Sequence, residues 1–195
     1  VNTYHNLLSR CYYEKCAFDK ALEENKLERE AIERQLSGRT VLNGQPYLVN
    51  HANEATFLLA AERFDEAEKC MDLVEEELQS LADKKSFQQY VETFRRNVLT
   101  PHKAKLALIR HESYIARSLI EQLEAMEDRR EDEIQLAQLL RAEYELQTGS
   151  GDAAVKRLDE VIQNGRAGLL KNQAVKLRET LLVAEPAETD EDVNG

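Results

Sequence analysis

The chain has 195 residues, 42% of them hydrophobic, which is enough apolar material for one domain or one continuous stack of repeats. Its net charge of −11 disfavours binding to nucleic acid or to an anionic membrane surface, and no apolar run approaches the roughly 20 residues that span a bilayer. Seven glycines and three prolines are few for this length, and strong helix formers dominate, so the composition predicts an all-α protein.

Two helical hairpins are expected in the first part of the chain. The first runs from Tyr4 to about Leu36 and the second from about Tyr47 to Leu81, with a loop over residues 37–46 between them. Each contains an amphipathic helix, a short break, and a second helix that opens with an aromatic residue followed by an acid and an alanine. A coiled coil is the structural rival, but no strict heptad persists over three or four repeats, so hairpins are favoured.

The two hairpins align without a gap, because FDKA at residues 18–21 lies over FDEA at residues 64–67. The blocks Y-x3-C-A-F-D-K-A-L from Tyr12 and A-E-R-F-D-E-A-E from Ala61 resemble the tetratricopeptide (TPR) consensus Y-x3-G-(N/D)-(Y/F)-x2-A-(L/I). The resemblance implies an all-α, right-handed superhelical stack of antiparallel helical hairpins, with about seven to nine helices. It covers most of residues 4–164 and is strongest in the first two hairpins.

The family pattern has a simple packing logic. A small alanine at the start of the second helix lets two helix backbones approach, and an aromatic residue fills the gap between hairpins. Here the turn glycine of the pattern is replaced by Cys16, Glu62 and His111, and the alanine spacing exceeds the usual 34 residues, so long-helix TPR-like bundles are the better comparison. The positions that the resemblance assigns to packing are Tyr12, Phe18, Ala21, Leu58, Phe64, Ala67 and Ala116.

Further hairpins are expected after the first two. A weaker third match lies at residues 111–116. The region before it, over 86–109, is longer than in the family pattern and is expected to be interrupted at Pro101. A fourth lies at residues 144–154, where the turn spacing deviates from the pattern, and an amphipathic helix from Leu169 to about Leu182 is expected to cap the stack. The predicted organisation is one repeat domain over 1–183, followed by an acidic, disordered tail over 184–195.

No motif for catalysis or for a cofactor is found in the sequence. It has no GxGxxG or GxxxxGK phosphate loop, no GxSxG serine and no HExxH pair. The three cysteines, Cys11, Cys16 and Cys70, are expected to be buried thiols in a reducing cytosol, and zinc is not expected because no CxxC pairing exists. The chain is therefore predicted to be a cytoplasmic, non-enzymatic protein without cofactor or metal.

The resemblance implies a concave groove, lined by the first helices of successive hairpins, that binds a peptide or another protein. The alternatives are a peptide-sensing regulatory module of a larger protein and a structural subunit in self-assembly, and a homodimer is possible. Asparagine amides suit an extended peptide backbone, and basic residues favour an acidic ligand group. The alternative is that the residues assigned to the groove are ordinary exposed polar residues without a binding role. The groove-facing positions are expected to be Asn6, Arg10, Tyr13, Asn53, Thr56, His102 and Lys105.

Overall fold

The computed structural model describes residues 2–36, 45–165 and 168–184, and every regular element within these ranges is helical. The predicted loop over 37–46 and the predicted tail over 184–195 lie almost entirely outside the described residues. The helices are α1 (Asn2–Glu14), α2 (Phe18–Leu36), α3 (Gln45–Ala60), α4 (Phe64–Ala82), the 3₁₀ turn η2 (Lys85–Phe87), α5 (Gln88–Phe94), the π-helical turn η3 (Arg95–Leu99), α6 (Thr100–Ile109), α7 (Ser113–Glu124), α8 (Glu131–Gln147), α9 (Gly151–Asn164) and α10 (Leu169–Ala184).

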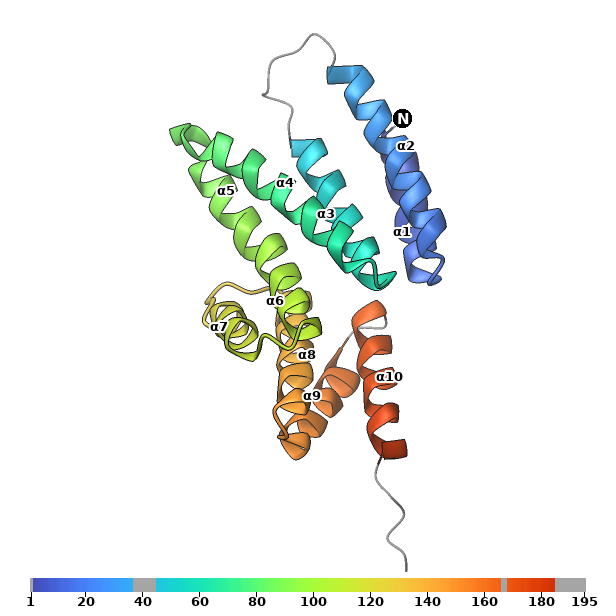
Figure 1. Cartoon of the computed structure of the whole chain (residues 1–195), viewed down its shortest axis with the longest axis vertical. Coiled ribbons are helices and arrows are strands. Elements are labelled where there is room, and N and C mark those ends of the chain that lie inside the picture. Colours follow the sequence, from blue (N-terminus) through green and yellow to red (C-terminus); the bar gives the residue numbers. More distant parts are fainter. Residues whose placement is uncertain (1, 37–44, 166–167, 185–195) are drawn as a thin grey trace, which may run out of the picture. The chain divides into compact units, whose positions relative to one another are not determined.

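Consecutive helices pack as neighbouring pairs, which confirms the predicted all-α architecture of helical hairpins. Because α5, η3 and α6 follow one another without a break, the described ranges contain nine helices when these three are counted as one. The chain divides into two compact units, Val1–Arg129 with α1–α7 and Arg130–Gly195 with α8–α10 (Figure 1). The single repeat domain over 1–183 stays a prediction.

The first unit contains three hairpins: α1 with α2, α3 with α4, and the helix from α5 to α6 with α7. Each hairpin packs on the next, α2 against α3 and α4 against the α5–α6 helix. Its main apolar core lies in the second and third hairpins, where Leu48, Val74, Leu78 and Val91 are almost completely buried. The junction between the first and second hairpins, described below, is polar instead.

Each of the four hairpins turns in the same way after its first helix. In the first turn the N–H of Ala17 donates to the carbonyl of Tyr12 and the N–H of Cys16 to that of Tyr13, both at 2.9 Å. This Schellman pattern satisfies the last helix carbonyls and requires a left-handed residue at its centre. The same pair of bonds recurs in the other three turns. The central residues are Cys16, Glu62, His111 and Gly149, with φ of 56°, 59°, 57° and 80°.

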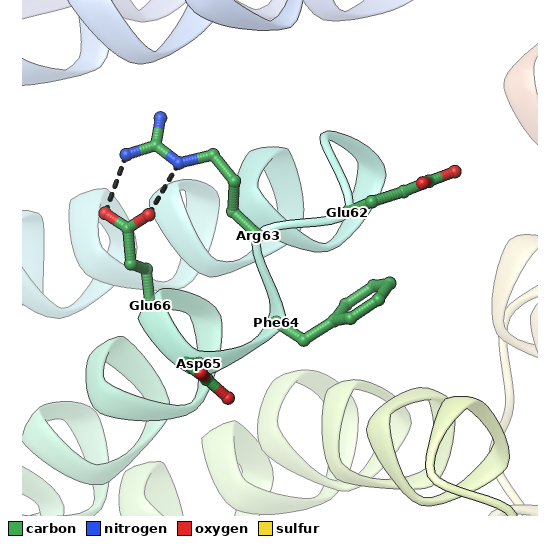
Figure 2. A pocket seen from close by; sticks show the side chains of 5 residues that line it. All are labelled: Glu62, Arg63, Phe64, Asp65 and Glu66. Carbon is green, nitrogen blue, oxygen red and sulfur yellow. Dashed lines mark hydrogen bonds and ion pairs between the residues drawn. The ribbon is translucent and has the colours of Figure 1, made fainter.

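The second turn is shown in Figure 2. Arg63 and Glu66 form an ion pair at 2.6 Å in the first turn of α4, with Phe64 between them in the chain. The shallow hollow here is lined only by residues 62–66, which are the turn itself and the start of α4. It is a product of the turn geometry, and we assign no binding role to it.

The turns set a common register for the second helix of every hairpin. The residue five positions after each left-handed centre is an alanine with 0% exposed surface: Ala21, Ala67, Ala116 and Ala154. The fourth hairpin keeps this register when Glu145, rather than Tyr144, is placed where Tyr12 stands in the first, because Glu145 supplies the carbonyl of the turn bond. The deviation in turn spacing expected from the sequence is therefore absent.

The helix from α5 to α6 runs through Pro101, so the predicted interruption there is wrong. The N–H of Thr100 donates to the carbonyl of Arg95, five residues earlier, and the Thr100 hydroxyl donates to the same oxygen at 3.0 Å. A proline in a regular α-helix clashes with the carbonyl four residues before it. The wider π turn of η3 relieves this clash and lets the helix continue.

The second unit consists of the α8–α9 hairpin with α10 packed against it. The ion pairs Arg157–Glu145 at 2.8 Å and Arg178–Asp159 at 3.3 Å join successive helices. The predicted terminal helix over 169–182 corresponds to α10. The core residues are Leu139, Ala142, Ala154, Leu158, Val161 and Ala174. Among the helices that the structure describes, none combines the length and the apolar character needed to cross a membrane.

Candidate functional site

A pocket of about 200 Å³ lies between α3 and the helix that runs from α5 to α6. Small-molecule sites usually have roughly 300–1,000 Å³, so this pocket has the size for one side chain rather than for a cofactor. None of its lining residues is an acid, a lysine or an arginine, although 32% of the chain is charged. The lining consists of Val49, Ala52, Asn53, Thr56, Phe94, Asn97, Val98 and His102.

The π turn supplies one wall of the pocket. Asn97 and Val98 belong to η3, and Phe94 directly precedes it. An inserted π turn changes the direction in which the following side chains point, and such turns occur frequently at functional sites. Pro101, which makes a regular helical turn unfavourable, lies directly before His102. The local sequence that disturbs the helix is thus the one that builds this wall.

His102 ties the two walls together. Its Nδ1 lies 2.5 Å from the backbone oxygen of Val98, and its Nε2 lies 2.7 Å from the hydroxyl of Thr56 on α3. A carbonyl can only accept, so Nδ1 carries a proton. Burial lowers the pKa of His102 and outweighs the opposite effect of the Val98 bond, so the ring is neutral near pH 7. Nε2 is therefore an acceptor, and the Thr56 hydroxyl has one proton for two acceptors, Nε2 at 2.7 Å and the carbonyl of Ala52 at 3.0 Å.

Two asparagine amides border the pocket. The half-buried side chain of Asn53 makes no hydrogen bond with any residue that the structure describes. The side-chain oxygen of Asn97 accepts from Arg96 at 3.0 Å, while its NH₂ group donates no bond within the described ranges. An amide offers both a donor and an acceptor, which are the two groups that an extended peptide backbone requires.

Three predicted groove residues line this pocket together: Asn53, Thr56 and His102. Lys105 is half-buried one turn further along α6 and does not line it. The sequence reading missed Asn97 because its position depends on the π turn. The only signal in the sequence is Pro101, which predicts an interruption in this region but not a π turn.

The three predicted groove residues of α1 lie elsewhere. Asn6 donates to the carboxylate of Glu28 on α2 at 3.3 Å, and Arg10 is exposed. The ring of Tyr13 lies 6.0 Å from that of Phe18 and 5.1 Å from that of Phe57, and burial is the main reason that its pKa is raised to about 12. The structure does not bring these side chains to the pocket, and their role in binding stays a prediction.

The junction between α2 and α3 contains a second set of polar groups. Asn25 and Asn50 are almost completely buried and bonded to each other, and Asn50 also donates to Glu28 at 3.0 Å. Glu28 has 6% of its surface exposed, so its carboxylate depends on the amides of Asn50 and Asn6 for hydrogen bonds. A polar junction of this kind favours one register between two helices, because any shift leaves buried groups without partners.

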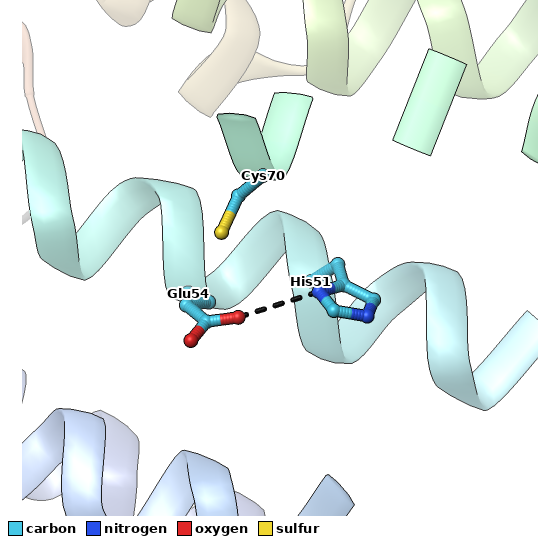
Figure 3. A group of neighbouring side chains, drawn as sticks. All are labelled: His51, Glu54 and Cys70. Carbon is cyan, nitrogen blue, oxygen red and sulfur yellow. Dashed lines mark ion pairs between the residues drawn. The ribbon is translucent and has the colours of Figure 1, made fainter. Parts of the chain in front are cut away.

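Beside this junction, His51 and Glu54 of α3 lie close to Cys70 of α4, with potential ligand atoms within 4.8 Å of one another (Figure 3). Arg29 reaches this cluster from α2 and forms a bidentate ion pair with Glu54, in which Nη2 and Oε1 are 3.0 Å apart. Burial of the Cys70 thiol and the neighbouring Glu54 raise the pKa of Cys70 to about 12. Sequence reasoning missed this cluster because its members have no characteristic spacing.

The cluster does not fit a metal ion well. A metal would require the thiolate of Cys70, whose formation the site opposes. It would also place a divalent cation beside the Arg29 guanidinium, which lies 3.2 Å from the Nδ1 of His51 and already neutralises Glu54. The set is explained as a hydrogen-bonded junction. The Nε2 of His51 is buried and has no hydrogen-bond partner among the described residues.

The expectation of three buried thiols is wrong for two of them. Cys70 is buried, but Cys11 and Cys16 are exposed. Cys16 is the left-handed residue of the first turn, which projects from the hairpin. Cys11 lies on a side of α1 that no other described helix of the first unit covers, as discussed below.

Comparisons of the chain with protein-family models, with curated proteins and with solved structures found no match. The function therefore has to be argued from the residues of the site.

Proposed function

We propose that this chain is a non-enzymatic, TPR-like scaffold that binds an extended peptide segment of another protein across the pocket between α3 and α6. The observation that carries the proposal is the pairing of an unengaged amide, that of Asn53, with an uncharged pocket sized for one side chain. Asn53, Thr56 and His102, which the helix register predicts to face the groove, all line this pocket. A cytoplasmic location, which the free thiols of the three cysteines favour, is part of the proposal.

The pocket chemistry defines the expected ligand. With His102 neutral and no other ionisable group in the lining, a charged side chain would lose its hydration without gaining a partner. An apolar or uncharged side chain is therefore preferred in the pocket, with the peptide backbone held by Asn53 and Asn97. Lys105 and Arg10 would favour acidic residues further along the peptide.

The same geometry favours binding over catalysis. A general base needs an available lone pair near the substrate. His102 is the one titratable side chain in the pocket lining, and its Nδ1 and Nε2 are occupied by Val98 and Thr56. The Thr56 hydroxyl and Nε2 of His102 have the spacing of a nucleophile–base pair, but no carboxylate lines the pocket to orient the ring and stabilise its protonated form, so we favour binding.

The proposal is tested with peptides selected from a displayed random library against the 195-residue protein, with affinities then measured by calorimetry. Replacing Asn53 and Asn97 together by alanine should weaken binding at least about tenfold, since two amide contacts are lost. Val49→Arg, at a pocket-lining position that is 43% exposed, should abolish binding by placing a charge at the pocket. Asn164→Ala, on the exposed surface of α9, is the matched control.

All four proteins should unfold at the same temperature within a few degrees. Failure to enrich any peptide would overturn the proposal, as would selected peptides that bind the Val49→Arg protein as tightly as the unmodified one. Concentration-dependent dimerisation that Val49→Arg abolishes would instead indicate the self-assembly alternative.

A further inference from the structure

The first helices of the three hairpins in the first unit share one docking register. Counted back from the left-handed turn residue, positions −12, −8 and −5 are Asn50, Glu54 and Phe57 in α3. All three contact the preceding hairpin. Asn50 bonds Asn25, Glu54 pairs with Arg29, and the ring of Phe57 lies 5.1 Å from that of Tyr13.

The third hairpin repeats this arrangement. The same positions in the helix from α5 to α6 are Leu99 of η3 and Lys103 and Leu106 of α6. Lys103 forms an ion pair with Glu75 of α4 at 3.1 Å, and Leu99 and Leu106 are buried in the core shared with α4. In both cases position −8 forms an ion pair with the second helix of the hairpin before, whereas Phe57, at position −5 of α3, contacts the first helix through Tyr13.

In α1 these positions are Tyr4, Leu8 and Cys11. Tyr4 is 64% exposed, Cys11 is exposed, and the adjacent Leu7 is 57% exposed. Among the described residues, α1 has α2 as its main neighbour and meets α3 near its end through Tyr13. We name Tyr4, Leu7, Leu8 and Cys11 the α1 stripe. The stripe is a contiguous apolar surface on one side of α1, which is unusual for a surface exposed to water.

The charges at the other junctions define what would cover the α1 stripe. Position −8 is Glu54 in α3, which meets Arg29 of α2, and Lys103 in α6, which meets Glu75 of α4. In α1 the same position is Leu8. A helix lying on α1 in this register would therefore need an uncharged, aliphatic contact face, because a buried arginine or glutamate would have no partner.

We propose that the α1 stripe is a docking surface for an amphipathic helix of a partner protein, which lies on α1 as α2 lies on α3 and has no charge on its contact face. The interface continues the series of hairpin junctions already present in the fold. It is separate from the peptide pocket and does not depend on that proposal.

The probe is a synthetic peptide with the sequence of residues 18–36, which is the helix that docks on α3. It carries Asn25→Leu, Glu28→Leu and Arg29→Leu, which replace the three polar residues that meet α3. The unmodified 18–36 peptide is the matched control. Fluorescence anisotropy with the 195-residue protein should show at least tenfold tighter binding of the modified peptide. Tyr4→Lys and Leu7→Lys should each weaken this binding at least tenfold, whereas Leu27→Lys on the surface of α2 should not.

Hydrogen exchange should show new protection in α1 when the modified peptide binds. Equal affinity of the two peptides would overturn the proposal, because the contact chemistry would then be wrong. Binding that is insensitive to both lysine substitutions would also overturn it, since the peptide would be replacing α2 on α3. A dimer in the absence of peptide that Leu7→Lys dissociates would assign the α1 stripe to a second copy and contradict the proposed occupant.

Discussion

Asn25 and Asn50 bind each other's backbone across the junction between α2 and α3. The side-chain amide of Asn25 donates to the carbonyl of Asn50 at 3.1 Å, and that of Asn50 donates to the carbonyl of Asn25 at 2.9 Å. Both residues are at most 1% exposed. The first hairpin is thus joined to the second by a buried reciprocal amide pair. At the equivalent positions of the next junction, between α4 and the helix from α5 to α6, the residues are the apolar Met71 and Leu99. Burial without partners would be costly for these amides, so the pair strongly favours this register.

Asn25→Ala should lower the free energy of unfolding by about 1–3 kcal/mol, because it leaves buried groups of Asn50 without partners. Asn25 and Asn50 replaced together should show a coupling of about 0.5–3 kcal/mol in a double-mutant cycle. Urea denaturation monitored by circular dichroism measures both values. The exposed Asn164→Ala should change stability by less than about 0.5 kcal/mol. Additive losses at Asn25 and Asn50 would contradict the pairing.

Two neighbouring alanines at the start of α9 provide a test of the helix-contact register. Ala154 has no exposed surface, whereas Ala153 is exposed. Ala154→Leu should cost about 1–3 kcal/mol because the added methyl groups force the α8 and α9 backbones apart. Ala153→Leu should be nearly neutral in the same thermal melt. The equivalent substitutions Ala21→Leu and Ala67→Leu should resemble Ala154→Leu, and equal melting of all variants would show the register to be wrong.

The left-handed turn residues predict gains as well as losses of stability. The backbone of Glu62, with φ of 59°, has a left-handed conformation that glycine adopts without strain. Glu62→Gly should therefore raise the free energy of unfolding by about 1 kcal/mol. Gly149→Ala should lower it by a similar amount, although a Cβ at that residue would meet no atom within 4 Å. Thermal denaturation measures both, and a destabilised Glu62→Gly protein would contradict the Schellman turn.

Glu54 predicts an acid-sensitive contribution to stability. Burial raises the pKa of this carboxyl, but the hydrogen bonds from His51 and Arg29 outweigh burial and lower the pKa from 4.5 to about 2. Because the folded pKa lies below the unfolded one, the stabilisation is present above about pH 4.5 and is lost as the pH falls toward 2. After allowance for solvent screening, it is on the order of 1–2 kcal/mol.

The measurement is urea denaturation between pH 2 and pH 6. Glu54→Gln should lose stability less steeply over this range than the unmodified protein. Glu76→Gln, at an exposed position of the same chain, should follow the unmodified protein. Identical pH profiles for all three proteins would show that Glu54 is not held ionised by the junction.

The hairpin register was accessible from sequence because it depends on local geometry. The FDKA and FDEA segments place Ala21 and Ala67 at the same distance from their turns, and no long-range information is needed to align them. The fourth hairpin was harder to align, since Gly149 marks the turn but Gly151 follows closely and obscures which glycine is left-handed. The backbone, with φ of 80° at Gly149, resolves this.

The candidate pocket was accessible only in part. Asn53, Thr56 and His102 follow from the helix register, but Asn97 and Val98 depend on a π turn whose formation balances the clash at Pro101 against the packing of α5–α6 on α4. The formation of this π turn cannot be predicted from composition and hydrophobic periodicity. The groove positions predicted on α1 illustrate the same limit. The side-chain amide of Asn6 donates to the buried carboxylate of Glu28 on the neighbouring helix, and the sequence does not reveal this contact.

The helical class, the first three turns and the alanines at the helix contacts could be predicted from the sequence, because they follow from interactions between residues that are close together in the chain. The polar groups that meet between hairpins could be identified only from the packed structure, where Arg29 pairs with Glu54 and Thr56 with His102. The physical reason is that side chains from separate hairpins are brought together by the packing of the hairpins. Their burial and their partners therefore exist only once the helices are packed.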